Sequence, residues 1–189
     1  MKKIALMCST LALTAAVFAP SAMAAETKLA PAVIAIVDMQ KVQEKSTAYQ
    51  SMVKQRDKYV AELKAEVAKD EAALRKMEES INKERTTLTQ EELVKKVDQF
   101  RTKMQEFQQK VQSRQEAIYK SFSTGTTKLT KEAFDPAVSE VAEKKGANMV
   151  TGSSQMMQFS PEFDITDEVV VIMNKKMPKF DLPKPKADK

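Results

Sequence analysis

Two long segments of the chain carry apolar residues at alternating gaps of three and four, the spacing of a single stripe on one face of a helix. The first segment extends from Val53 to Ile81 and the second from Leu93 to Val111. Paired antiparallel, the two stripes face each other throughout if the chain turns once near residue 87. The pattern therefore predicts a long antiparallel helical hairpin over residues 39–127.

Capping signals mark the ends of the predicted hairpin helices. Thr89 and Glu92 have the spacing of a capping box, which places the turn just before Thr89. Asp38 can cap the first helix, which is expected to run without a break to about Arg85. Asp70 lies on the apolar stripe, and the pattern alone offers no reason for a carboxylate there.

Three short β-prone runs flank the hairpin, at residues 33–37, 149–151 and 156–159. Strands this short make a thin core and leave free edges, so we expect other copies of the chain to complete the body. The predicted fold is mainly α, with the hairpin projecting as a coiled-coil arm from a small β body that other copies complete. The residues expected between copies are Ile34, Ile36, Met149, Val150 and Phe159.

Two short helices complete the predicted body. One is capped at Asp135 and ends at Gly146, and the other begins at Thr166. The Pro- and Lys-rich end of the chain is expected to be disordered. The predicted regions are a signal peptide at 1–24, a body at 25–38 and 128–176, through which copies are expected to join, the hairpin arm at 39–127 and the disordered tail at 177–189.

The first residues have the organisation of a signal peptide. Lys2 and Lys3 precede an apolar run at 4–19, and small residues follow it up to a cleavage site between Ala24 and Ala25. The chain's one cysteine falls inside this segment, so the exported protein is expected to have no disulfide bond. The pattern predicts an exported protein.

Composition limits the chemistry of the exported chain. It has no histidine, and with the signal peptide removed no cysteine, which leaves few ways to build a catalytic or metal site. No Gly-rich phosphate loop is present, so we expect no enzyme, no cofactor, no metal and no use of ATP. The net charge of +5 is basic, but without a recognition motif we expect no nucleic-acid partner.

Several short motifs, taken in order, resemble the Skp/OmpH family of periplasmic chaperones. They are Ile34-Ala35-Ile36-Val37-Asp38-Met39, Ala147-Asn148-Met149-Val150 and Asp164-Ile165-Thr166-Asp167-Glu168-Val169, on either side of the long basic hairpin. The resemblance covers residues 33–176. It implies a periplasmic homotrimer with a small β-barrel-like trimerisation body. The three hairpins would surround a cavity that holds unfolded outer-membrane proteins without ATP. It does not explain the tail after residue 177.

Apolar residues away from the hairpin seam are the candidate client contacts: Met52, Tyr59, Val94 and Tyr119. Packing against a neighbouring helix is the alternative for each. The basic surface could also attract anionic lipid or lipopolysaccharide. The alternative function is a structural or adaptor protein of the cell envelope that uses the hairpin to bridge its components.

Poor helix formers interrupt the pattern of the second hairpin helix at residues 121–127, beside the Ser- and Thr-containing residues 46–51 of the first. We predict a hinge where the arm leaves the body. Its candidate residues are Ser123, Thr124 and Gly125. Ordinary variation in an exposed helix is the alternative interpretation.

Overall fold

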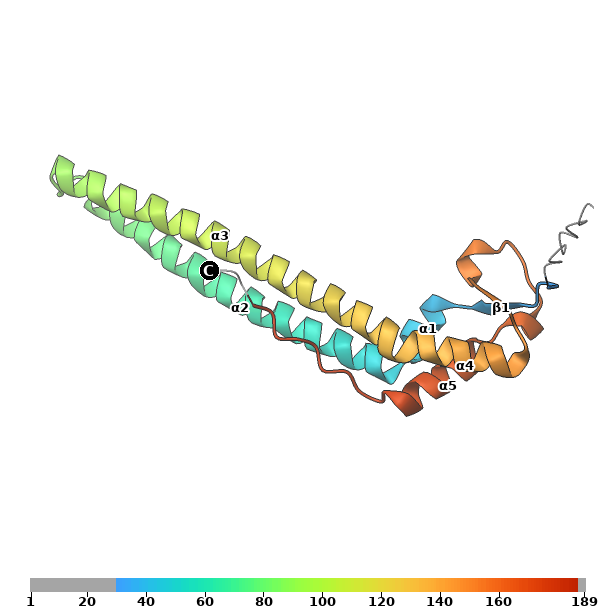
Figure 1. Ribbon diagram of the computed structural model, residues 1–189. Helices are drawn as coiled ribbons and strands as arrows, with labels where there is room; N and C mark the ends of the chain where they lie inside the picture. Colours follow the sequence, from blue (N-terminus) through green and yellow to red (C-terminus); the bar gives the residue numbers. More distant parts are fainter. Residues whose placement is uncertain (1–29, 187–189) are drawn as a thin grey trace, which may run out of the picture. The chain divides into compact units, whose positions relative to one another are not determined.

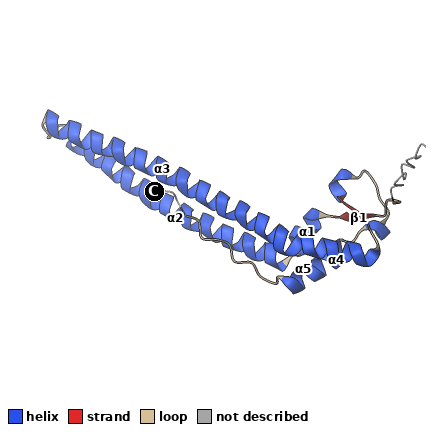
Figure 2. Ribbon diagram, in the orientation of Figure 1, coloured by secondary structure: helices blue, strands red, loops and turns tan. Residues whose placement is uncertain are grey.

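The computed structural model describes residues 30–186, so the predicted signal peptide and its cleavage site at Ala24 and Ala25 lie outside the described residues. From Ala32 onward the described chain forms one compact unit. It is mainly helical, as predicted, and has a small two-stranded sheet (Figures 1 and 2). The elements are β1 (Ile34–Val37), α1 (Met39–Lys45), α2 (Thr47–Glu84), α3 (Gln90–Leu129), a π-helical turn (Thr130–Phe134), α4 (Asp135–Lys145), β2 (Met149–Gly152) and α5 (Thr166–Lys176).

The two longest helices, α2 and α3, lie side by side and run in opposite directions (Figure 1). A short turn joins them, and α3 starts with the predicted capping box. The Thr89 backbone N–H donates to the Glu92 carboxylate at 2.9 Å, and the Glu92 N–H donates to the Thr89 hydroxyl at 3.3 Å. Leu63 and Leu74 are buried on the seam between the helices.

Ion pairs cross from α2 to α3 and explain the carboxylate on the apolar stripe. Lys110 Nζ lies 2.7 Å from Asp70 Oδ2, so Asp70 reaches past the seam to a cation on the other helix. Arg114 pairs with Glu66 at 3.3 Å. Half-exposed pairs of this kind contribute little to stability, but they favour one register of the two helices over others.

The sheet has two parallel strands. Ile34 pairs with Met149, and the register continues to Val37 with Gly152. The predicted third strand at 156–159 is wrong, because those residues adopt no strand. The Ile36 carbonyl accepts the Ile165 N–H at 3.0 Å, so β1 is already paired from both β2 and the segment before α5. On that second side the bridge lies at Ile36, opposite Asp164.

The first hairpin helix is broken at Ser46, contrary to the expectation of one helix from Asp38 to Arg85. The Ser46 N–H donates to the Val42 carbonyl at 2.8 Å and ends α1, while its hydroxyl accepts the Tyr49 N–H at 3.2 Å and caps α2. Because α1 packs against α5, the predicted arm boundary at residue 39 is also wrong. The long helix starts only at Thr47.

The chain passes from α3 into α4 without a break. Phe134 has helical dihedral angles (φ −70°, ψ −58°), so Asp135 does not cap a separate helix as predicted. The five-residue π-helical turn takes up the change between the two helices, and Pro136 is tolerated in the first turn of α4. Gly146 ends α4 in the left-handed conformation (φ 69°), as its sequence signal predicts.

The candidate hinge residues do not interrupt α3, which is α-helical through Leu129. Ser123 and Thr124 are exposed on that helix and Gly125 is buried. The backbone irregularities lie instead at Ser46 and in the π-helical turn. Serine and threonine on an exposed helix face lower helix propensity without breaking a helix that is held by its neighbours.

The tail was expected to be disordered, but residues 177–186 pack along α2 and α3 (Figure 1). Phe180 and Leu182 are each only 5% exposed and belong to the same buried cluster as Met52 and Leu129. The correction has a simple cause, because two apolar side chains within a Pro- and Lys-rich segment suffice to dock it. Residues 187–189 lie outside the described part of the chain.

Candidate functional site

The seam between α2 and α3 leaves its apolar residues half-buried along most of its length. A two-helix pair can cover only one side of each stripe, and within residues 30–186 no further helix lies over the part of the seam nearer the turn (Figure 2). The half-buried stripe residues are Val60, Val67, Met77, Ile81, Leu93, Val97, Phe100, Met104, Phe107 and Val111.

An open groove follows this seam toward the body. Its floor is apolar and its rim carries Lys64, Glu71 and Gln115. The guanidinium of Arg56 lies 4.9 Å from the centre of the Phe122 ring, which holds the aromatic side chain against the groove. The apolar residues lining the groove are Val60, Leu63, Val67, Ala68, Val111, Ile118, Tyr119 and Phe122.

A second, more polar groove lies nearer the turn. Met77 and Val94 line it together with side chains of both charges, among them Lys95, Asp98 and Lys103. Its surroundings could accept polar as well as apolar segments of an extended chain. The described surface of the hairpin thus offers apolar strips bordered by charge rather than one deep pocket.

The four predicted client-contact residues have different environments. Tyr119 is 76% exposed and lines the apolar groove, and Val94 is 48% exposed and lines the second. Tyr59 is half-buried against the core cluster. Met52 is completely buried, so its prediction as a client contact is wrong. It fills the space between α2 and α3 under the tail, a contact that helix periodicity could not show.

Phe122 is the groove residue that sequence reasoning missed. It lies four residues after Ile118, so the continued spacing of the stripe could have identified it. The poor helix formers around it favour the interpretation of this stretch as a hinge instead. Its edge-on contact with the Tyr49 ring, at 6.3 Å between centres, ties the groove to the base of α2.

The body exposes apolar residues on and after its second strand. Met149 is 51% exposed, Val150 39% and Phe159 36%, whereas Ile36 is 3% exposed and packs in the core of its own chain. Ile36 is predicted to lie between copies, and that placement is wrong because its side chain is buried within its own chain. Ile34 is half-buried. The exposed set also includes Met156, Met157, Phe163 and Val171.

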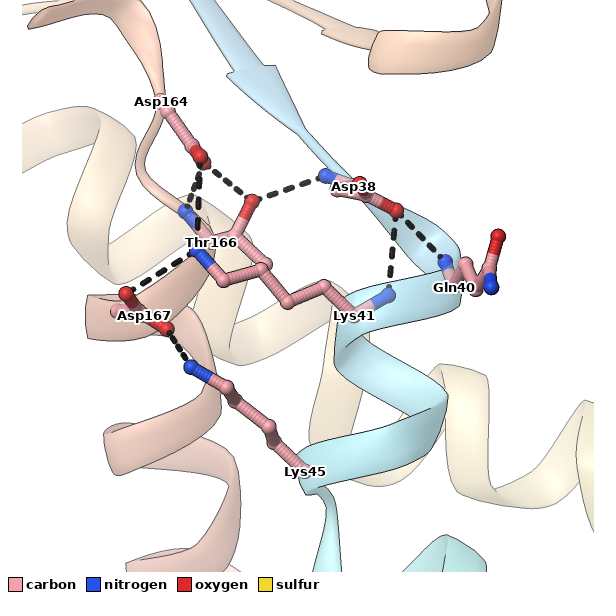
Figure 3. A network of polar contacts seen from close by, with 7 residues as sticks. All are labelled: Asp38, Gln40, Lys41, Lys45, Asp164, Thr166 and Asp167. Carbon is pink, nitrogen blue, oxygen red and sulfur yellow. Dashed lines mark hydrogen bonds and ion pairs between the residues drawn. The ribbon is translucent and has the colours of Figure 1, made fainter. Parts of the chain in front are cut away.

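A polar network joins the end of β1 to the start of α5 (Figure 3). Asp38 caps α1 by accepting the Gln40 and Lys41 N–H groups at 2.9 and 3.1 Å. The Asp38 N–H donates to the Thr166 hydroxyl at 2.9 Å, and that hydroxyl donates to Asp164. Thr166 is fully buried, so the network satisfies a polar group that would otherwise be costly there.

Two lysines of α1 extend the network to Asp167. Lys45 Nζ lies 2.9 Å and Lys41 Nζ 3.1 Å from the Asp167 carboxylate. These hydrogen bonds lower the pKa of Asp167, and the bond to Asp167 raises the pKa of Lys41. Both shifts favour the charged forms, which suits a structural clamp between α1 and α5 and offers no proton-transfer pair.

A similar clamp joins α4 to α5. Lys176 Nζ lies 2.8 Å and Lys144 Nζ 2.9 Å from the Glu140 carboxylate. These two hydrogen bonds lower the pKa of Glu140 to about 2. Glu140 is therefore charged at any pH at which the protein would work.

The described residues contain no group of three side chains able to hold a metal ion. Within residues 30–186, no helix is both long and apolar enough to cross a lipid bilayer. The features that remain for function are the half-covered seam, its two grooves and the exposed apolar surface of the body.

These features define a protein of paired long helices on a small α/β body. A model of the family described as outer membrane protein (OmpH-like) matches residues 33–173, which is most of the chain. The chain belongs to this OmpH-like family, and that membership supports a chaperone role.

A solved structure shares the fold. It is described as an OmpH-like outer membrane chaperone from Caulobacter crescentus, and it superposes with a TM-score of 0.77 at 17% sequence identity. The match covers 85% of this chain and 95% of the other. Among proteins with curated functions, none matches this chain.

Proposed function

We propose that this protein is an ATP-independent periplasmic holdase that binds unfolded outer-membrane proteins and prevents their aggregation. The observation that carries the proposal is the seam of α2 and α3, whose apolar residues stay half-exposed over most of its length. A folded protein that keeps such a strip open has a use for it. Family membership supports the same role.

The chemistry of the grooves fits weak binding without sequence preference. Tyr119 presents a flat, exposed ring and Val94 a small apolar surface, and both grooves are open to solvent rather than closed around a ligand. Many shallow contacts of this kind hold an unfolded chain while leaving it free to move and depart. We propose Tyr119, Val94, Phe122 and the exposed edge of Tyr59 as client contacts.

We further propose that three copies join through their bodies, so that three hairpins surround one client. Met149, Val150 and Phe159 are exposed on the body and suit contacts between copies. A two-stranded parallel sheet is seldom left uncovered, which favours completion by another copy. Native mass spectrometry should find three copies per particle, and a monomer would contradict this part of the proposal.

The test of holdase activity is dilution of a urea-denatured outer-membrane β-barrel protein into buffer with and without the chaperone. Light scattering should fall as the molar ratio of trimer to client approaches one, and added ATP should change nothing. Unchanged aggregation at a molar excess of trimer would contradict the proposal and favour an adaptor role in the envelope.

A further inference from the structure

The tail of the chain binds the hairpin as an extended peptide. Phe180 and Leu182 are each 5% exposed, whereas the side chains of Lys179 and Asp181 are 71% and 80% exposed. Alternate side chains of an extended segment face opposite sides, so one pair enters the hairpin and the other stays in solvent. The family match ends at residue 173, before this segment begins.

The hairpin holds this segment largely through its backbone. Gln55 donates from Nε2 to the Phe180 carbonyl at 2.7 Å and accepts the Leu182 N–H on Oε1 at 2.9 Å. The Ser51 hydroxyl donates to the same Phe180 carbonyl at 3.1 Å, and the Ser121 hydroxyl donates to the Pro183 carbonyl. Bonds to the main chain would form with other sequences in the same conformation.

A glycine makes room for the two apolar side chains. A Cβ atom at Gly125 would lie 2.6 Å from Leu182 Cδ1 and 3.3 Å from Phe180 Cε1. Met52 lies beneath, fully buried. The same position is a predicted hinge because glycine weakens helices, but its contacts show that the tail side chains take the space a Cβ would fill.

We infer that the hairpin carries a binding site for extended peptides, which the chain's own tail occupies and which client segments can take. This site, here called the tail site, consists of Ser51, Met52, Gln55, Ser121 and Gly125. The inference rests on the proposed holdase function. Transmembrane β-strands alternate apolar and polar residues, so an unfolded outer-membrane protein presents the pattern of Phe180 and Leu182 many times. Main-chain hydrogen bonds combined with pockets for alternate side chains are an established way to bind such segments.

The first experiment frees the tail site in the full chain with the double variant Phe180→Ser and Leu182→Ser. The matched control is Lys179→Ser and Asp181→Ser, which changes the exposed neighbours in the same segment. The probe is a fluorescent peptide with the sequence of residues 177–186. By fluorescence anisotropy it should bind the freed variant at least tenfold more tightly than it binds the control or the natural chain.

A strand-like competitor then tests the client half of the inference. An unlabelled peptide with Leu and Phe at alternate positions between Thr and Ser should displace the probe from the freed variant, and the same composition with its apolar residues adjacent should compete less well. Equal probe binding by the freed variant and the control would overturn the inference. So would probe binding that neither unlabelled peptide reduces.

The natural chain provides a second measurement that needs no variant. The Leu182 N–H is bonded to Gln55, so its hydrogen exchange is slow while the tail is docked. An excess of denatured β-barrel protein should speed this exchange, and exchange that stays slow while the client is held in solution would refute the inference but leave the holdase function standing. If the natural chain did not prevent client aggregation while the freed variant still bound the probe, only the proposed holdase function would be refuted.

Discussion

Replacing Gly125 with alanine should stabilise the protein only when the tail side chains are absent. In a helix interior, alanine is about 1 kcal/mol more favourable than glycine. In the natural chain, however, the new Cβ would lie 2.6 Å from Leu182 Cδ1 and 3.0 Å from Met52 Sδ. Overpacking of this kind typically costs about 1–3 kcal/mol, which cancels or exceeds the gain.

In the Phe180→Ser and Leu182→Ser background, Gly125→Ala should raise the free energy of unfolding. The Leu182 methyl group is gone, and the remaining close contact is with the flexible end of Met52. Gly125→Ala should then stabilise the protein by up to about 1 kcal/mol. The interaction free energy between the two sites is thus expected to be about 1–3 kcal/mol.

The assay is urea unfolding followed by far-ultraviolet circular dichroism. The four proteins compared are the natural chain, Gly125→Ala, the double serine variant and the combination of both changes. All are measured at one protein concentration because assembly shifts apparent stability. Thr124→Ala is the matched control, since Thr124 is exposed one residue away and should have the same effect in both backgrounds. If Gly125→Ala were equally stabilising with and without the tail side chains, the explanation of this glycine by close packing would be refuted.

Four further outcomes are expected. The folded-state pKa of Glu140 is lowered from 4.5 to about 2, so its ion pairs stabilise the fold above pH 4.5 and this stabilisation is lost as the pH falls toward 2. Glu140→Gln should therefore lower the melting temperature at pH 7 but not at pH 2. Tyr119→Ser should weaken client binding roughly fivefold, about 1 kcal/mol, and Lys120→Ser much less, as measured by titration of a labelled client. Client capture followed by stopped-flow fluorescence should slow as salt shortens the Debye length to about 8 Å, and rates that ignore salt would exclude steering by the basic surface. Val150→Asp should reduce the trimer fraction in native mass spectrometry with the helical content unchanged, whereas Ile36→Asp should unfold the chain because Ile36 is 3% exposed.

The parts of the fold that sequence could predict are those decided by near neighbours. Asp38, Thr89 and Gly146 each end or begin a helix through contacts within a few residues, and all three act as predicted. The two helix stripes likewise follow from spacing alone. The break at Ser46 does not, because the apolar spacing allows a continuous helix and the break depends on α1 packing against α5.

The predictions for the candidate site were wrong where the environment of a residue depends on contact with a segment distant in sequence. Met52 is a predicted client contact because it lies off the hairpin seam, but the tail and α3 bury it completely, which agrees with the alternative of packing. The composition of residues 177–189 predicts disorder on average, and an average hides the two apolar residues that dock the segment. No local pattern in α2 or α3 shows that the tail returns to them.

A tethered occupant also determines which ligands can take the tail site. Because the tail is part of the same chain, it competes at an effective concentration that reaches the millimolar range for short linkers. A single free peptide at micromolar concentration would rarely displace it, even with the same intrinsic affinity. An unfolded β-barrel protein held by the seam is different, because it brings eight or more strand-like segments close to the tail site at once. The docked tail would therefore leave isolated peptides unbound and yield to a client that the hairpins have already captured, so that the tail site adds a second hold after the first contact.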